Sequence, residues 1–577
     1  MPSTLGSLTA LTLLNLKQNC LSGSLPQSLG QLLRLVTLEL YLNVLTGSLP
    51  DSFAGLSSLQ VLSVSFNAFS GPFPSVVLQL TGLHTLELGG SFFTGSLPAG
   101  IGGMTALVEL YLETGLMSGT LPSALGCLVV LGDLELGNNQ FSGPLPESLG
   151  SLSALYFLAA FSNTLTGPLP ASLGSLSTLL LLNLHENLLT GPLPSELGQL
   201  NRLLNAYLND NELTGTLPTA LGQLSKLVGV YLNNNRLSGP ILPALGQLTK
   251  LKLLRLDNNS FTGTIPSTLG AVSGLAVLNL YANALTGTLP TFLGNLTALN
   301  ILYLSSNMFT GTVPADLGSL TSLGLLFIES TLIGGTVPAQ LLQLPQLMYL
   351  YLDSNCLTGS IPVLVGSALV LLSVGDNLLT GTLPLGLARL TYLSAPGNHL
   401  EGNFSYLSQT PYLYFADLSA NSFSGSVPSV LSSNIGTLNI GANRITGTVP
   451  TAVMNYSYLN YVNLSNSFLE GAIPSELCGT TSLTLDVSDT GIECFSGCLT
   501  SANLMVYGAD PDCHDGSILR EFLTICAIFL LCVVVFSLAY ASGVADICSP
   551  ERTGSVADGA QRRRWKHFCP SLSLFAR

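Results

Sequence analysis

Apolar residues recur along the chain at a fixed spacing. The first clear copy of the pattern is Leu11-x-x-Leu14-x-Leu16-x-x-Asn19-x-Leu21-x-Gly23-x-Leu25-Pro26-x-x-Leu29-Gly30-x-Leu32. It returns every 24 residues, and we call the position of Asn19 the marker. Equivalent markers continue in steps of 24 to position 355 and then fall at 377, 398, 421, 443, 467 and 490. The pattern therefore predicts 21 repeats, and we expect no domain boundary within residues 1–493.

Each position in the repeat has a physical role. The Leu-x-Leu segment predicts a short strand whose leucines point inward and whose intervening residues face solvent on the opposite side. Stacked strands form one long parallel sheet. Asn occupies 16 of the markers, where its amide can pair turn groups that would otherwise be buried without partners. The other five markers are Ser91, Gly115, Thr331, Ser467 and Thr490.

This pattern resembles the leucine-rich repeat, and its Leu-x-Gly-x-Leu/Ile-Pro-x-x-Leu-Gly half is similar to the plant-type subclass of receptor-like kinases and receptor-like proteins. The resemblance covers about 85% of the chain. It implies an α/β-type solenoid, a curved leucine-rich repeat arc with a long parallel sheet on its concave face. It also implies a second short strand after the Gly-x-Leu-Pro turn. The repeat at Gly239-Pro240-Ile241-Leu242 departs from the pattern, because its proline moves to position 243.

Composition and charge exclude several classes of protein. Only 8% of the residues are charged, well below the fraction typical of soluble enzymes. Residues 1–517 carry a net charge of −17 and residues 546–577 carry +3. An acidic repeat region of this size disfavours nucleic-acid binding.

The C-terminal part predicts a membrane anchor. Residues 522–544 contain no charged side chain and would span about 34 Å as a helix, enough for a bilayer core. The basic stretch at 562–566 then places a short tail, residues 545–577, in the cytosol. A buried core helix and a removable lipid-anchor signal are the alternatives, although a removable signal would end in the apolar run. We therefore expect a single-pass plasma-membrane protein with extracellular repeats.

Two features fit an extracellular location. Residues 478–517 predict a Cys-rich cap in which two disulfides shield the end of the core, with a zinc site beside His514 as the alternative. The cysteines are Cys478, Cys494, Cys498 and Cys513. Five Asn-x-Ser/Thr sequences predict glycosylation, and they begin at Asn258, Asn295, Asn403, Asn455 and Asn463.

The N-terminus of the sequence lacks a predicted cap or signal peptide. Pro2 already occupies the Leu-Pro position of a repeat, so we expect the sequence to be incomplete at this end. The tail leaves no room for a kinase domain, and the scattered histidines form no catalytic or metal-binding pattern. We predict that the protein is not an enzyme, with no cofactor and no metal.

The variable residues of the predicted sheet suggest where a ligand binds. Three groups fall on neighbouring strands, where they face solvent, and large aromatic side chains favour contact surfaces. The acidic zone comprises Glu87, Glu109, Glu113, Asp133 and Glu135. The aromatic zone comprises Tyr303, Phe327, Tyr349 and Tyr351, flanked by Glu329 and Asp353. The basic zone comprises Arg202, Lys226, Lys250, Lys252 and Arg255.

These features predict a cell-surface protein whose repeats bind an extracellular protein, peptide or glycan. The resemblance to kinase-lacking receptor-like proteins implies signalling through a partner, such as a co-receptor kinase. The chain also resembles the leucine-rich repeat surface antigens of trypanosomatid parasites, which implies an adhesion or coat protein without signalling. A soluble inhibitor of wall-degrading enzymes is a third possibility, which the predicted membrane span disfavours.

Overall fold

The computed structural model describes residues 1–364, 366–452, 456–474, 483–493 and 504–507. The chain divides into two units, Met1–Ala509 and Asp510–Arg577, and every described residue belongs to the first. The fold below is that of the first unit.

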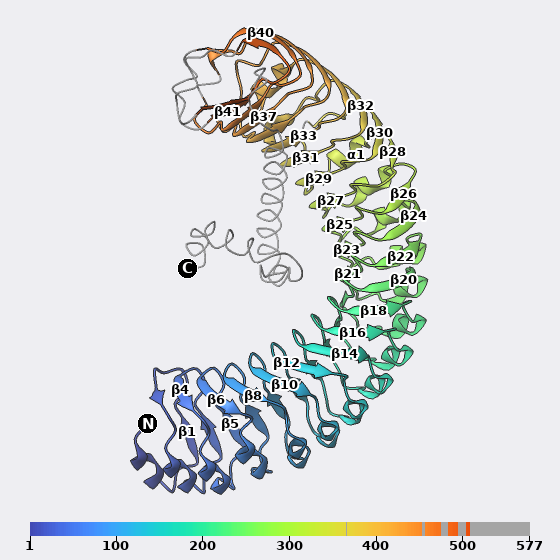
Figure 1. Cartoon of the computed structure of the whole chain (residues 1–577). Coiled ribbons are helices and arrows are strands. Elements are labelled where there is room, and N and C mark those ends of the chain that lie inside the picture. The colour runs from blue at the N-terminus through green and yellow to red at the C-terminus, as the bar shows by residue number, and fades with distance from the viewer. Residues whose placement is uncertain (365, 453–455, 475–482, 494–503, 508–577) are drawn as a thin grey trace. The chain divides into compact units, whose positions relative to one another are not determined.

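The odd-numbered strands form one 22-stranded parallel sheet along the inner side of the curve (Figure 1). Each strand pairs with the strand of the next repeat, so the repeats stack in chain order. Most of these strands have only three residues, and each repeat contributes one strand to the sheet. The strands are β1 (Leu13–Asn15), β3 (Thr37–Glu39), β5 (Val61–Ser63), β7 (Thr85–Glu87), β9 (Glu109–Tyr111), β11 (Asp133–Glu135), β13 (Phe157–Ala159), β15 (Leu181–Asn183), β17 (Asn205–Tyr207), β19 (Gly229–Tyr231), β21 (Leu253–Arg255), β23 (Val277–Asn279), β25 (Ile301–Tyr303), β27 (Leu325–Phe327), β29 (Tyr349–Tyr351), β31 (Leu371–Ser373), β33 (Tyr392–Ser394), β35 (Phe415–Asp417), β37 (Thr437–Asn439), β39 (Tyr461–Asn463), β41 (Leu483–Asp486) and β43 (Leu504–Tyr507).

The even-numbered strands form two outer sheets, of 13 and 8 strands. Each outer strand begins just after a marker and most end at or beyond the repeat glycine. They are β2 (Ser22–Gly23), β4 (Val44–Gly47), β6 (Ala68–Pro72), β8 (Phe92–Gly95), β10 (Leu116–Thr120), β12 (Gln140–Gly143), β14 (Thr164–Pro168), β16 (Leu188–Gly191), β18 (Glu212–Gly215), β20 (Arg236–Pro240), β22 (Ser260–Gly263), β24 (Ala284–Thr288), β26 (Met308–Thr310), β28 (Gly334–Gly335), β30 (Cys356–Gly359), β32 (Leu378–Gly381), β34 (His399–Gly402), β36 (Ser422–Gly425), β38 (Arg444–Gly447), β40 (Phe468–Ala472) and β42 (Gly491–Glu493).

Short helices follow the Leu-Pro step. Consecutive repeats from η1 (Ser3–Ser7) to η14 (Ala315–Ser319) each carry a five-residue 3-10 helix, which begins directly after the position of the repeat proline. Proline suits this position because its fixed φ begins the return toward the concave sheet. The later helices are α1 (Ala339–Leu342), η15 (Leu387–Arg389) and η16 (Phe404–Gln409).

The solenoid is confirmed, with three corrections to the sequence predictions. Among the described residues, only Ala339–Leu342 is α-helical, so the helical layer of an α/β solenoid is here a 3-10 layer. The second strand of each repeat precedes the Leu-Pro step instead of following it. The concave sheet has one strand more than the 21 predicted repeats, because β43 pairs with β41 inside the segment that we assigned to the cap.

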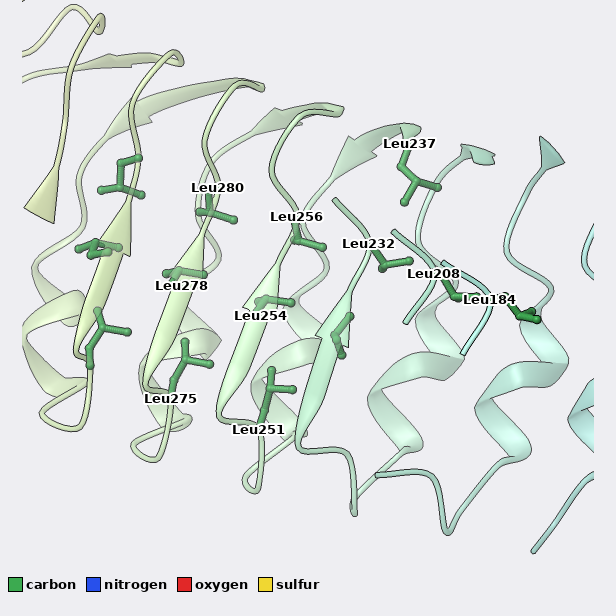
Figure 2. Close-up of a cluster of buried hydrophobic side chains, with 14 of the residues drawn as sticks. Leu184, Leu208, Leu232, Leu237, Leu251, Leu254, Leu256, Leu275, Leu278 and Leu280 are labelled. Carbon is green, nitrogen blue, oxygen red and sulfur yellow. The ribbon is translucent and has the colours of Figure 1, made fainter. Parts of the chain in front are cut away.

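Leucines from successive repeats fill the space between the concave and outer layers. Figure 2 shows this stacking, in which Leu251, Leu254 and Leu256 repeat as Leu275, Leu278 and Leu280. The labelled leucines are almost fully buried. Burying such a side chain contributes roughly 1.5–3 kcal/mol, so the periodic leucines stabilise the stack.

The marker asparagines form the predicted ladder. Asn235 is typical: its amide nitrogen donates to the carbonyls of Leu208 and Leu232 at 2.9 and 3.1 Å, and its Oδ1 accepts from the N–H of Leu213 at 3.0 Å. Each asparagine therefore joins its own repeat to the preceding one. The residue before the marker adopts a left-handed conformation, as at Leu42, with φ of 54°, and at Asn234, also with φ of 54°. The sequence analysis did not identify this position.

Both the ladder and the outer layer change at one repeat. Thr331 replaces the marker asparagine, and its hydroxyl donates to Oδ1 of Asn355, an acceptor that elsewhere receives a backbone N–H. The 13-stranded outer sheet ends at β26 and the 8-stranded sheet begins at β28, with a single bridge between Thr312 and Gly334. The concave sheet continues through β25, β27 and β29 without interruption.

Candidate ligand-binding face

The concave strands present their side chains in two columns. Residues six positions before the marker form the first column, and residues four before it form the second. In the acidic zone the register aligns Thr85, Glu109 and Asp133 in the first column. It aligns Glu87, Tyr111 and Glu135 in the second. The strands β7, β9 and β11 thus bring four of the five predicted acidic residues onto one surface, and Glu113 lies just beyond β9.

Hydroxyl groups orient several of these carboxylates. Thr85 Oγ1 donates to Glu109 Oε2 at 3.0 Å, and the Tyr111 hydroxyl donates to Asp133 Oδ2 at 2.9 Å. The hydroxyl of Ser63 donates to Glu87. These neutral donors fix the side chains without neutralising their charge.

The acidic side chains are half-buried or buried. Asp133 is only 9% exposed, and its Oδ1 atom has no hydrogen-bond partner; the same is true of the buried Oε2 atom of Glu113. Burial, with the negative charges of Glu113 and Asp133, raises the pKa of Glu135 from 4.5 to about 7. Burial also raises the pKa values of Glu87, Glu113 and Asp133. Burial in the acidic zone thus disfavours the charged form of these carboxylates.

The backbone makes room for Glu113. A Cβ atom added at Gly89 would lie 2.8 Å from Glu113 Oε1, a separation that real side chains essentially never show. Glycine at this position lets the carboxylate lie directly over the neighbouring strand's end.

A groove of about 280 Å³ adjoins the acidic zone at the rim of the repeats. It lies at the two consecutive repeats whose markers are Ser91 and Gly115, and Thr114 and Gly115, which directly follow Glu113, belong to its lining. Phe92 and Leu116 also line it and are 55% and 41% exposed. A missing marker asparagine therefore coincides with a partly apolar hollow.

The aromatic zone is a stack of rings. The register aligns Tyr303, Phe327 and Tyr351 in the second column. The ring centroids are 4.5 Å apart between Tyr303 and Phe327, and 4.4 Å apart between Phe327 and Tyr351. Tyr349 lies in the first column, opposite Leu325.

The prediction that these aromatic side chains face solvent is wrong for two of them. Phe327 is 7% exposed and Tyr351 is 8% exposed. They bury one another across adjacent repeats on the concave side, and they do not join the leucine core. Tyr303 and Tyr349 are half-buried. Register shows which face a side chain occupies, but not how neighbouring rings cover it.

The carboxylates beside the ring stack are also half-buried. Burial, with the nearby Asp353 charge, raises the pKa of Glu329 to about 7. Burial raises the pKa of Asp353 to about 6, against the hydrogen bonds that its Oδ1 accepts from Ser373 Oγ and Gly375 N, both at 2.8 Å. The other oxygen of Asp353 has no hydrogen-bond partner.

Further ring pairs of this surface were not among the predicted binding residues. In the first column, Tyr392 and Phe415 stack with centroids 4.3 Å apart. Tyr207 and Tyr231 stack at 4.5 Å in the second. Tyr111 was also not predicted as the donor to Asp133. Each ring pair occupies one column of consecutive repeats, 24 residues apart for Tyr207 and Tyr231 and 23 apart for Tyr392 and Phe415, so comparing columns repeat by repeat would have found both ring pairs.

The basic zone is split by its contacts. Arg202, Lys226, Lys250 and Lys252 are exposed, as predicted. Arg255 instead pairs with Asp257, at 3.3 Å between Nη2 and Oδ2. Its charge is therefore largely neutralised within the chain.

The Leucine Rich Repeat family model matches residues 10–32, 131–152, 250–272 and 298–320. Among solved structures, the chain is similar to the Arabidopsis receptor kinase HAESA, solved with the peptide hormone IDA and the co-receptor SERK1. The identity is 32% and the TM-score 0.78, over 85% of this chain and 84% of that one. The chain belongs to the plant-type leucine-rich repeat receptor-like proteins.

Two further structures resemble this plant-type leucine-rich repeat protein. The plant peptide hormone receptor RGFR1, in complex with RGF2, is 28% identical with a TM-score of 0.75, over 88% of this chain and 93% of that one. A TDR receptor is 30% identical with a TM-score of 0.75, over 85% and 90%. No curated protein sequence matches the chain. In these receptors the chain matches leucine-rich repeat ectodomains, which bind ligands and are not the catalytic part.

Several predicted sites of this leucine-rich repeat protein lie outside the described residues. They are Cys478, Cys494, Cys498, Cys513, Asn455 and the apolar run at 522–544. In the described part of the chain, no helix has the length and apolar character that a membrane crossing requires. Among those same residues, no three His, Cys, Asp or Glu side chains are arranged to hold a metal ion.

The other predicted modification sites differ in accessibility. Asn258, Asn295 and Asn403 are exposed. Asn463 is half-buried on β39, and its Oδ1 accepts from the N–H of Ser465 at 2.9 Å. The isolated cysteines Cys20, Cys127 and Cys356 are exposed and free.

Proposed function

We propose that this protein is a receptor-like surface protein whose concave sheet binds an extended extracellular peptide. The observation that carries the proposal is the concave surface itself, where carboxylates and aromatic rings from neighbouring repeats form continuous columns. The similarity to HAESA and RGFR1, which were solved with peptide hormones, supports a peptide as the ligand. An extended peptide suits this surface because it can contact one side chain after another along the stack.

The membrane topology forms part of the same proposal. Residues 522–544 cross the plasma membrane once, the repeats are extracellular and residues 545–577 are cytosolic. Residues 478–517 form a disulfide-bonded cap, and the exposed sequons carry glycans. Signalling then requires a partner, and a co-receptor kinase fits because HAESA was solved with the co-receptor SERK1.

An adhesion or coat protein is the second candidate. The exposed aromatic and aliphatic side chains near the C-terminal end of the solenoid favour it, since they offer contact area outside the concave columns. Examples are Tyr412, Tyr458 and Phe468, which are all more than half exposed. Adhesion needs no cytosolic partner, and this difference separates the two candidates.

Photo-crosslinking of the full-length chain tests the ligand-binding proposal. A photoreactive amino acid replaces Tyr156 or Tyr281, both exposed beside the concave columns, and Glu147 on the helical side serves as the control position. Secreted peptides should be trapped at the first two positions and not at the third. Ligand capture at Glu147 alone would overturn the proposed binding face.

Two cell experiments test the proposed membrane topology and the proposed signalling partner. An epitope tag after Arg577 should survive external protease on intact cells while the repeats are digested. A membrane partner should co-precipitate with the intact chain and be lost when residues 545–577 are removed. Digestion of the tag contradicts the topology, and equal recovery of the same partners with and without the tail favours adhesion.

A further inference from the structure

The acidic zone lacks a positive partner within the described chain. Five carboxylates lie on three adjacent repeats, yet the ion pairs among described residues join other groups: Lys17 to Glu39, Arg236 to Glu212 and Arg255 to Asp257. Carboxylates that are buried without a cation are unfavourable, and such groups cluster at functional sites.

Asp133 is the strongest indication of a bound cation. The side chain is 9% exposed, and its Oδ2 is held by Tyr111 at 2.9 Å while Oδ1 has no partner. Glu109 stands beside it on the preceding strand, in the same column. A hydrogen-bond donor that reached Oδ1 would satisfy an atom that the chain itself leaves unpaired.

The arrangement fits an organic cation better than a metal ion. The described carboxylates do not converge in any group of three that could hold a metal. They are distributed over two columns and three strands spaced about 4.8 Å apart. A guanidinium or ammonium group carries several donors that can address separate carboxylates, and therefore suits a distributed site.

We propose that the acidic zone is the subsite for an arginine or lysine side chain of the peptide ligand, held by Asp133, Glu109 and Glu135. This inference rests on the proposed function. The adjoining groove takes an apolar side chain of the same peptide, because Thr114 and Gly115 connect it directly to Glu113.

The strand spacing also specifies where a second cation would lie. Glu87 and Glu135 occupy the second column two strands apart, which corresponds to about 10 Å. A peptide in the polyproline II conformation advances about 3.1 Å per residue and presents every third side chain on the same side, so two basic residues three positions apart match this separation.

Fluorescence anisotropy with a defined probe tests the proposal on the full-length chain in detergent. The probe is a labelled, acetylated and amidated hexapeptide, Gly-Arg-Leu-Ser-Arg-Gly, and its control replaces each arginine with citrulline, which keeps the shape and removes the charge. We expect the arginine peptide to bind at least about tenfold more tightly than the citrulline peptide, as expected for a charge-assisted contact.

The double variant Asp133→Asn with Glu135→Gln should weaken binding of the arginine peptide by about tenfold or more. Asn can still accept from Tyr111, so the fold keeps this contact. The matched control, Asp51→Asn with Glu147→Gln, removes two charges on the exposed helical side and should change the affinity less than about twofold. The melting temperature separates binding from structure: it should hold or rise in the double variant, because the site no longer buries unpaired charge.

Four results would overturn the subsite. They are equal affinity for both peptides, equal loss of affinity in the control variant, a large fall in the melting temperature of the double variant, and displacement of the peptide by millimolar Ca²⁺. If photo-crosslinking still traps a ligand on the concave side, the proposed function survives the failure of this subsite. If no ligand is trapped there either, both fail.

Discussion

The acidic and aromatic zones share the same backbone arrangement but carry side chains that behave differently. Both lie on three neighbouring concave strands with the same register. In the aromatic zone, the rings of Tyr303, Phe327 and Tyr351 cover one another, and Asp353 beside them is the one carboxylate there that keeps an unpaired buried oxygen. In the acidic zone, Asp133 and Glu113 both retain such oxygens within a cluster of five carboxylates. Rings that cover one another stabilise the fold, whereas a cluster of like charges is suited to a ligand of opposite charge.

This contrast reverses the preference that the sequence suggested. The aromatic residues were expected to face solvent, and large aromatic side chains favour contact surfaces. The structure instead places the aromatic zone opposite the repeat where the outer layer is interrupted, between β26 and β28. We therefore assign ring stacking a stabilising role and assign ligand contact to the acidic zone, with the accessible edges of Tyr303 and Tyr349 as secondary contacts.

The largest expected effect is on the aromatic zone. Phe327→Ala removes the central ring of the stack and should lower the free energy of unfolding by about 3 kcal/mol, because a buried aromatic leaves a cavity and two unstacked neighbours. Chemical denaturation measures the change, and Phe327→Leu should recover part of it. A loss below about 0.5 kcal/mol would mean that the ring is a surface feature after all.

The second prediction tests whether the marker asparagines contribute equally to stability in the repeats that carry the two zones. Asn139→Leu and Asn307→Leu should each cost about 2 kcal/mol, because each leaves buried backbone groups unpaired. Asn139 bonds to Leu112 and Leu136, and Asn307 makes the corresponding bonds to Leu280 and Leu304. Denaturation midpoints that differ clearly between the two variants would show that the zones differ in their asparagine ladder and not only in their surface side chains.

A smaller effect of opposite sign is expected in the acidic zone. Asp133→Asn with Glu135→Gln should raise the free energy of unfolding by about 1 kcal/mol, since it removes unpaired buried charge. Asp353→Asn, beside the ring stack, should not stabilise the protein, because Asp353 Oδ1 accepts two hydrogen bonds. The same denaturation experiment compares them, and stabilisation by Asp353→Asn would erase the distinction between the zones.

The last prediction concerns pH. The pKa of Glu135 is about 7 in the fold against an ordinary 4.5, because of burial and the charges of Glu113 and Asp133. The folded state therefore holds a proton that the unfolded chain releases, and stability should fall as pH rises from about 4.5 to about 7. Glu135→Gln should flatten this decline in melting temperature, and Glu329→Gln should do the same from the aromatic zone. A melting temperature that rises over this interval would contradict the assignment.

The sequence alone was sufficient for the repeat length, the concave sheet, the buried leucines and the asparagine ladder. Each of these depends on a spacing that the chain repeats many times. The accessibility of Phe327 and Tyr351 could not be predicted in this way, because it depends on how rings from neighbouring repeats lean against each other. The left-handed position before the marker was also missed, since residues as different as Gln18, Leu42 and Phe66 occupy it.

The interruption at Thr331 has a mechanical consequence. A solenoid transmits force from repeat to repeat. Between β26 and β28 the regular strand pairing is reduced to the bridge from Thr312 to Gly334, and two backbone hydrogen bonds remain, from Leu332 N to Phe309 O at 2.9 Å and from Gly334 N to Gly311 O at 2.7 Å. On the inner side, Phe327 joins the same repeats by stacking between Tyr303 and Tyr351. We expect tension on the outer edge to separate β26 from β28 while the stacked rings on the inner side stay in contact. The aromatic zone would then hold the two repeats together when their outer strands part.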